Sequence, residues 1–128
     1  MLHLDWVTID AHDPGRLANF WAEALDYDIE YDSTNDPDNA GSEREIVLTP
    51  KSGSTTKLLL AEGHDEKKDK NRLHFDLRPD DQAAEVARVE ALGARKVDIG
   101  QGDQTWVVMA DPEGNEFCIL RARSPKDE

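Results

Sequence analysis

The sequence has a single cysteine, Cys118, among 128 residues. One cysteine excludes an intrachain disulfide framework and a multi-cysteine zinc site, and it favours a reducing compartment. The sequence also has no apolar run near the roughly 18 residues that a membrane span needs, and its first residues lack the basic and apolar regions of a signal peptide. We therefore expect a cytoplasmic protein with no membrane partner.

Positive charge is scarce as well. The chain has 15 Lys+Arg against 28 Asp+Glu, a formal net charge of −13, which would repel the phosphates of nucleic acids and anionic lipids. It also lacks a glycine-rich phosphate loop, a nucleophile elbow and a histidine-glutamate helix motif. These absences argue against nucleic-acid, nucleotide, serine-hydrolase and metalloprotease functions.

The first half of the chain predicts a strand, a helix and three further strands. Alternating side chains predict a strand over Leu4–Asp10, and Asp13-Pro14 then supplies a helix cap followed by a proline in the first turn. Apolar residues at helical spacing continue the helix through Leu25. A surface loop is predicted over Ser33–Ser42, and the further strands over Asp28–Asp32, Arg44–Thr49 and Thr56–Ala61.

The second half repeats this order after a polar connection at Gly63–Asn71. A strand is predicted over Leu73–Arg78, and Asp80 or Asp81 then caps a helix that ends at Gly93. The remaining predicted strands are Arg95–Ile99, Thr105–Ala110 and Asn115–Arg121.

The repeat predicts an α+β fold of two βαβββ modules. We expect one domain over residues 1–128, with module one at about 1–63 and module two at about 71–122. Each module alone would be marginally stable, so the two sheets are expected to share a core and enclose one cleft for a small ligand.

Polar side chains share one face of the strand predicted over Leu73–Arg78. Because side chains alternate along a strand, His74, Asp76 and Arg78 lie on the face opposite Phe75 and would point into the cleft. An exposed sheet face also carries polar residues for solubility alone, so both interpretations stay open.

Two other predicted strands contribute candidate ligand contacts. Trp6 and Thr8 share the cleft-facing side of the first strand, where Trp6 either packs in the core or stacks on a planar ligand. Glu116 and Cys118 share a face of the last strand, where a cysteine beside apolar neighbours is most often an inert buried thiol.

Three segments resemble the glyoxalase/bleomycin-resistance group, the vicinal-oxygen-chelate superfamily. They are Asp13–Trp21 (DPGRLANFW), Lys70–Leu77 (KNRLHFDL) and Asp111–Cys118 (DPEGNEFC), in the order expected for that group. The resemblance implies that the mixed sheets of the two modules form a U-shaped cleft, and that the protein is a homodimer.

The resemblance also implies where a metal would bind. Metal-using members, such as glyoxalase I, extradiol dioxygenases and fosfomycin-resistance transferases, take ligands from the first strand, from its equivalent in the second half and from the last strand. These positions correspond to Trp6, His74 and Cys118, of which only His74 keeps its usual ligand type. An alternative site joins His74 with Asp76 and Glu116, as one histidine and two carboxylates.

We therefore predict a glyoxalase-like protein that binds a small organic molecule. In the favoured interpretation it is a metal-free binding or sequestering protein, with ligand contacts from Trp6, Thr8, Asp76, Arg78 and Cys118. The alternative is a lyase, isomerase or dioxygenase in which a divalent ion (Zn, Ni, Mn or Fe) polarises the substrate and His74 or Glu116 moves protons. A third interpretation is a regulatory or structural subunit.

Overall fold

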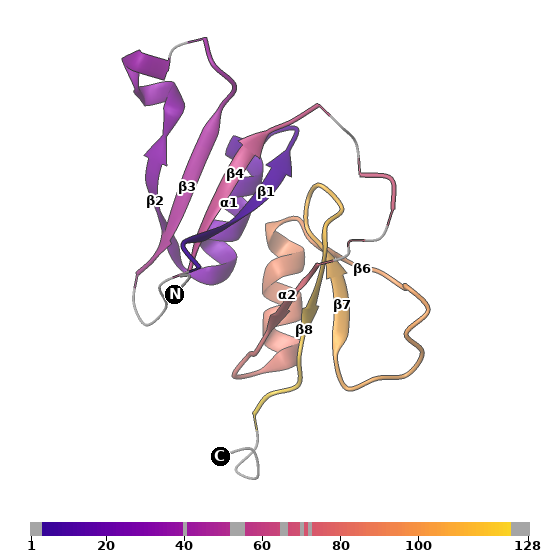
Figure 1. Cartoon of the computed structure of the whole chain (residues 1–128). Coiled ribbons are helices and arrows are strands. Elements are labelled where there is room, and N and C mark those ends of the chain that lie inside the picture. Colours follow the sequence, from indigo (N-terminus) through magenta and orange to yellow (C-terminus); the bar gives the residue numbers. More distant parts are fainter. Residues whose placement is uncertain are drawn as a thin grey trace. The chain divides into compact units, whose positions relative to one another are not determined.

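The computed structural model describes residues 4–39, 41–51, 56–64, 67–69, 71 and 73–123. The chain divides into two compact units, Met1–Glu66 and Lys67–Glu128. Each unit has its own four-stranded sheet and its own α-helix (Figure 1). None of the helices in the described ranges is both long and apolar enough to span a membrane.

The first unit has a mixed sheet. Its strands lie in the order β1-β4-β3-β2, with β1 parallel to β4 and the other neighbours antiparallel. Two short 3-10 helices, η1 (Ser33–Asn35) and η2 (Pro37–Asn39), occupy the loop predicted after β2. The other elements are β1 (Trp6–Ala11), α1 (Pro14–Leu25), β2 (Tyr27–Asp32), β3 (Glu45–Pro50) and β4 (Lys57–Glu62).

The second unit repeats this topology. Its strands lie in the order β5-β8-β7-β6, again with one parallel pair, β5 and β8. The predicted α+β fold of two βαβββ modules with mixed sheets is therefore confirmed, while the cleft between the modules stays a prediction. The elements are β5 (Phe75–Leu77), α2 (Gln82–Leu92), β6 (Arg95–Lys96), β7 (Val107–Ala110) and β8 (Glu116–Ile119).

Helix α1 begins where the sequence predicts. The Asp13 carboxylate accepts a hydrogen bond from the Arg16 backbone N–H at 3.1 Å, and Pro14 lies in the first turn. The helix packs against the sheet of the first unit, and the core between them is apolar. Its buried side chains are Leu17, Ala18, Phe20 and Trp21 from α1, with Ile46, Leu48, Leu58 and Leu60 from the sheet.

Both ends of helix α2 are also fixed by residues next to them in the sequence. The Asp81 carboxylate accepts a hydrogen bond from the Ala84 backbone N–H at 3.0 Å, so Asp81 and not Asp80 is the cap. Gly93 ends the helix with a φ of 118°, a left-handed conformation that favours glycine. The core of the second unit contains Val86, Val89, Met109, Phe117 and Ile119.

Substitution of the α2 cap tests this assignment. Asp81→Ala is expected to lower the free energy of unfolding by about 1 kcal/mol, because the Ala84 N–H loses its acceptor. The matched control, Asp80→Ala, is expected to change it by less than about 0.5 kcal/mol. Urea unfolding followed by circular dichroism measures both, and equal effects of the two substitutions would contradict the assignment.

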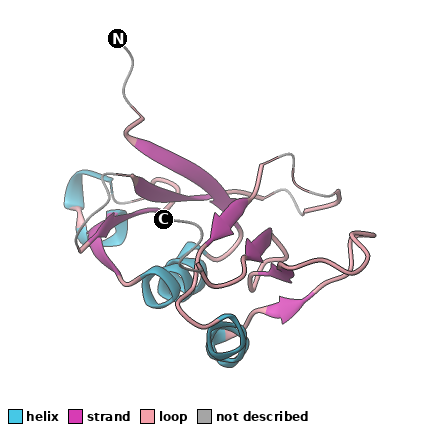
Figure 2. Cartoon of the chain, turned by 90° about the horizontal axis from the view of Figure 1, so that it is seen from below, coloured by secondary structure: helices cyan, strands magenta, loops and turns pink. Residues whose placement is uncertain are grey.

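The strands of the second unit are shorter than predicted, and β6 shows why. It ends at Lys96 instead of Ile99. Beyond it, Asp98 accepts a hydrogen bond from the Gly100 N–H at 2.8 Å, and the Gln101 side chain accepts one from the Ile99 N–H at 2.8 Å. These side chains take backbone donors that a strand ladder would use, so residues 97–106 form a loop (Figure 2).

Two predicted connections lie partly outside the described residues. The turn at Pro50–Ser54 is described only at its first two positions, and the polar connection at Gly63–Asn71 is described only in part. The segment Lys67–Asp69 and Asn71 belong to the second unit, where they contact β8.

Candidate functional site

Two of the predicted site residues come from the start of the second unit. His74 directly precedes β5, and Asp76 is the middle residue of that strand. Both are exposed, whereas Phe75 and Leu77 on the opposite face are half-buried, as alternation along a strand requires. The Nε2 atom of His74 lies 3.1 Å from Oδ1 of Asp76.

The pairing of two strands brings Cys118 to this pair. Strand β5 runs parallel to β8, and Asp76 lies opposite Cys118 in the register. Residues opposite each other in a sheet point to the same face. One ligand atom each from His74, Asp76 and Cys118 therefore lies within 4.8 Å of the other two.

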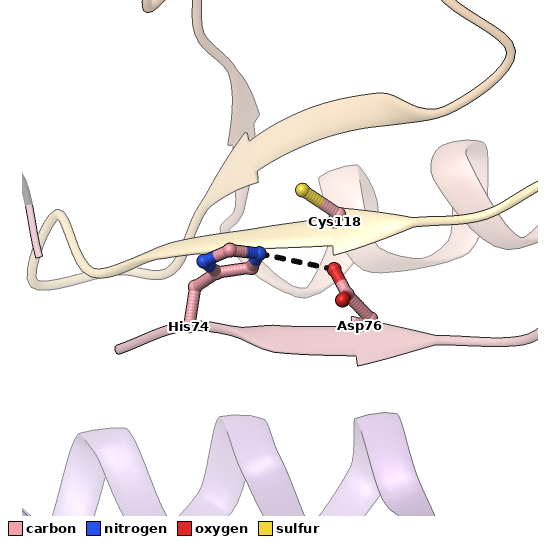
Figure 3. Close-up of side chains that lie close together, drawn as sticks. All are labelled: His74, Asp76 and Cys118. Carbon is pink, nitrogen blue, oxygen red and sulfur yellow. Dashed lines mark ion pairs between the residues drawn. The ribbon is translucent and has the colours of Figure 1, made fainter. Parts of the chain in front are cut away.

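These three side chains form a triangle, which we call the His-Asp-Cys group. Figure 3 shows the Cys118 sulfur above the gap between the imidazole and the carboxylate. Residue Cys118 is 7% exposed and therefore buried, whereas the side chains of His74 and Asp76 are 42% and 55% exposed. The group offers one nitrogen, one oxygen and one sulfur donor, so it could hold a metal ion or the polar part of a ligand.

Glu116 lies on β8, the strand of Cys118, but its carboxylate contacts residues outside the His-Asp-Cys group. Its carboxylate is 3.0 Å from Nζ of Lys67 and accepts a hydrogen bond from the Asn71 backbone N–H at 3.3 Å. Burial raises the pKa of the Glu116 carboxyl, but the Lys67 ammonium and the backbone hydrogen bonds outweigh it and hold the pKa below its ordinary value. The structure thus places Glu116 as an ionised anchor for the segment before β5.

Arg78, predicted on the same face as His74, also has a backbone partner. Its Nη1 donates a hydrogen bond to the carbonyl of Arg121 at 2.8 Å. This contact ties the residue that follows β5 to the segment that follows β8. The side chain remains exposed, so a ligand contact at Arg78 stays a prediction.

Trp6 and Thr8 belong to the first unit, on the sheet face that we call the open face. The open face carries side chains from neighbouring positions on β1, β4, β3 and β2. These side chains lie on the opposite side of the sheet from the buried side chains of β3 and β4. Trp6 is 47% exposed, and Thr8 is exposed in the middle of the strand. One row of neighbouring residues crosses this face from strand to strand: Thr8, Leu59, Val47 and Tyr31.

Sequence reasoning did not join Cys118 to His74 and Asp76 as a possible metal site, and it missed Lys67 altogether. Phe75 and Phe117 are register partners in the parallel pair, but alternation along the strands does not show that these two residues pair. Matching these two phenylalanines would have placed Asp76 opposite Cys118. Lys67 has no local signal either, because it lies in a polar segment with other charges.

Solved structures share this fold over nearly their whole length. The fosfomycin resistance protein FosX from Mesorhizobium loti is 16% identical, with a TM-score of 0.73 over 98% of this chain and 96% of that one. A mutant FosX from Listeria monocytogenes, complexed with Mn(II) and 1S,2S-dihydroxypropylphosphonic acid, is 14% identical, with a TM-score of 0.71 over 99% and 97%.

A third similar structure has a different role. TnmS3, an antibiotic-binding protein from a Streptomyces species, is 21% identical, with a TM-score of 0.64 over 96% of this chain and 98% of that one. At such identities the likeness shows the fold and not the activity. No curated protein sequence is significantly similar to this chain.

The sequence itself gives the family. Residues 6–120 match the glyoxalase-like domain. This range contains all three segments that carry the resemblance. The two βαβββ modules agree with that match. This chain therefore belongs to the glyoxalase-like domain family, within the vicinal oxygen chelate superfamily.

Proposed function

We propose that this protein binds a small organic molecule, with the open face of the first sheet as a stacking surface for a planar part of that molecule. The observation that carries the proposal is the 47% exposure of Trp6. Tryptophan is usually well buried, and here Leu59 and Val47 on the same face are only half-buried. An exposed indole beside aliphatic side chains offers a planar ligand an apolar contact surface.

The charge of the chain indicates which ligands this face favours. The formal net charge is −13, and Asp10 and Glu45 are exposed on the open face, both opposite Ala61 in the register. Negative potential attracts cations, and an indole face binds a cation through its π electrons. Lys57 on the same face is ion-paired with Glu30 at 3.0 Å, so a planar organic cation still suits the open face better than an anion.

Similar structures support a drug-like ligand. One is described as an antibiotic-binding protein and others as fosfomycin resistance proteins. Sequestering a compound needs a binding surface and no reaction. The proposed role is therefore metal-free binding, for which the open face supplies the apolar surface and polar groups at its edges.

A fluorescence titration with 9-aminoacridine, a planar cation, tests this proposal. Trp6→Ala is expected to raise the Kd by about tenfold, which corresponds to the roughly 1.4 kcal/mol of one aromatic contact. The matched control is Trp106→Ala, which removes an indole of 36% exposure from the second unit. Equal affinity of wild type and Trp6→Ala, or equal loss in both variants, would contradict the role of Trp6.

A metal-dependent lyase, isomerase or dioxygenase is the second candidate, and the His-Asp-Cys group favours it. In that case the His-Asp-Cys group would hold the divalent ion that polarises the substrate, so His74 would be a metal ligand. Glu116, ion-paired with Lys67, is then the remaining candidate to move a proton. Melting temperatures with fosfomycin and with 9-aminoacridine separate the two candidates. Stabilisation by 9-aminoacridine in EDTA supports metal-free binding, whereas stabilisation by fosfomycin that requires added Mn²⁺ supports the enzyme.

A further inference from the structure

We infer that the His-Asp-Cys group is a binding site for a thiophilic divalent ion such as Zn²⁺, built by the second unit alone. The inference does not depend on ligand binding at the open face, which belongs to the first unit. The two proposals can therefore succeed or fail separately.

The positions of the three donors suit one small ion. In tetrahedral zinc sites with nitrogen, oxygen and sulfur ligands, metal–ligand distances of about 2.0–2.3 Å place the donors about 3.4–3.6 Å apart. His74 Nε2 and Asp76 Oδ1 are 3.1 Å apart, and all three donors lie within 4.8 Å of one another. The side chains of His74 and Asp76 are exposed and can rotate towards the buried Cys118 to close the remaining difference, and one coordination position stays open.

The backbone fixes where these donors lie. Asp76 and Cys118 are opposite each other in the parallel pair, and His74 lies on the same face, two residues before Asp76. Loop residues could drift apart, but two of these donors are held by the hydrogen-bonded sheet. The site is thus largely formed before an ion binds.

The kinds of donor select the ion. A thiolate and an imidazole favour zinc, cobalt or nickel, whereas manganese and magnesium prefer sites rich in oxygen. A divalent ion with one thiolate, one carboxylate and a neutral imidazole has no net charge, which suits a group that contains the buried residue Cys118. When the ion binds, the Cys118 thiol gives its proton to the buffer.

This site differs from the one that the resemblance implies. In the site that the resemblance implies, the ligand position on the first strand corresponds to Trp6, whose side chain offers no metal donor. Glu116 could supply oxygen, but its carboxylate is held by Lys67 and the Asn71 N–H. The residues therefore fit a Zn²⁺-like ion in the second unit and do not fit an ion that requires a first-strand ligand at position 6.

A nucleophilic relay explains the geometry less well. In a Cys-His-Asp relay the imidazole lies between the thiol and the carboxylate and uses one ring nitrogen for each. Figure 3 shows a triangle instead, with the sulfur above the gap between the imidazole and the carboxylate. Three donors around a common point are the arrangement that an ion requires.

Titration of the untagged, EDTA-treated full chain with Co²⁺ tests the site. We expect one ion per chain, with a thiolate-to-cobalt charge-transfer band in the near ultraviolet, and displacement of Co²⁺ by equimolar Zn²⁺. Cys118→Ser is expected to abolish the charge-transfer band, and His74→Ala or Asp76→Asn to raise the Kd at least about tenfold. Mn²⁺ is expected to bind more weakly than Co²⁺.

The matched control is His64→Ala. His64 also lies near a carboxylate, 3.2 Å from Glu43, but no thiol joins that pair in the described part of the chain. Its removal is expected to leave Co²⁺ binding unchanged. Absence of the thiolate band in wild type, an unchanged Kd in His74→Ala, or tighter binding of Mn²⁺ than of Co²⁺ would each overturn the inference.

Circular dichroism and melting temperature show whether each variant is folded. Asp76 is 55% exposed, so Asp76→Asn is expected to keep the fold even where a change at the buried Cys118 does not. If Cys118→Ser is unfolded, Cys118→Ala replaces it. Full-affinity Co²⁺ binding by a folded Asp76→Asn variant contradicts the three-donor site whatever the cysteine variants do.

Discussion

Replacement of Trp21 by alanine is expected to lower the free energy of unfolding by about 3–5 kcal/mol. The Trp21 side chain is 1% exposed and is the largest in the core. Its ring meets that of Phe20 edge to face, with centroids 5.0 Å apart and an interplanar angle of 83°. Alanine would leave a cavity between α1 and the sheet that the neighbouring side chains fill only in part.

The matched control is Trp6→Ala, because it removes the same side chain from a position that is 47% exposed. That substitution is expected to cost less than about 1 kcal/mol. Urea unfolding is best followed by circular dichroism, since both variants lose a fluorophore. Similar losses in the two variants would show that Trp21 does not fill the core in the way described.

The helices could be predicted because their signals are local. Asp13, Asp81 and Gly93 lie within one turn of the helix ends that they define, and their hydrogen bonds reach only a few residues along the chain. Strand ends were less predictable. Strand β6 ends early because the side chains of Asp98 and Gln101 accept hydrogen bonds from backbone N–H groups that a longer strand would use.

Which residues form the candidate site depends on the strand register, and no local sequence pattern fixes that register. Alternation puts Glu116 and Cys118 on one face, but it does not say which of them lies opposite Asp76. The parallel pairing of β5 with β8 decides for Cys118. Glu116 is instead paired with Lys67, 49 residues earlier in the chain.

The exposure of Trp6 also depends on tertiary structure. The pattern of β1 shows that Trp6 and Thr8 share a face, but it does not show whether that face is covered. In the first unit the residues buried beneath α1 belong to the other face, with Leu58 and Leu60 on β4. Packing in the core and stacking on a ligand were both compatible with the sequence. Trp6 is 47% exposed, so it is not packed in the core, and the ligand contact stays a proposal.

Loss of the ion pair between Asp32 and Arg44 is expected to lower stability by about 2 kcal/mol near neutral pH. The Asp32 carboxylate accepts hydrogen bonds from Nη2 of Arg44 at 2.7 Å and from Nε at 3.2 Å, and the side chain is 15% exposed. It also accepts hydrogen bonds from the backbone N–H and the hydroxyl of Thr34. Asp32→Asn removes the charge that Arg44 pairs with and keeps the shape of the side chain.

The pH dependence of this loss has a definite sign. The Arg44 guanidinium lowers the pKa of Asp32 from 3.8 to about 2, against the opposing effect of burial and with help from Thr34. Because the folded pKa lies below the unfolded one, the stabilisation is complete above about pH 4 and disappears as the pH falls through about 2. Wild type should therefore lose stability over this window faster than Asp32→Asn does.

Urea unfolding at pH 6, 4, 3 and 2 measures the two curves. With 28 Asp and Glu in the chain, every variant loses stability in acid, so only the difference between wild type and variant reports on Asp32. That difference should shrink from about 2 kcal/mol at pH 6 towards zero near pH 2. Asp28→Asn on the same strand, where the side chain is 61% exposed and 4.0 Å from Lys51, is expected to follow wild type throughout. A difference for Asp32→Asn that stays constant with pH would mean that the asparagine disturbs η1 and that the charge pairing contributes nothing.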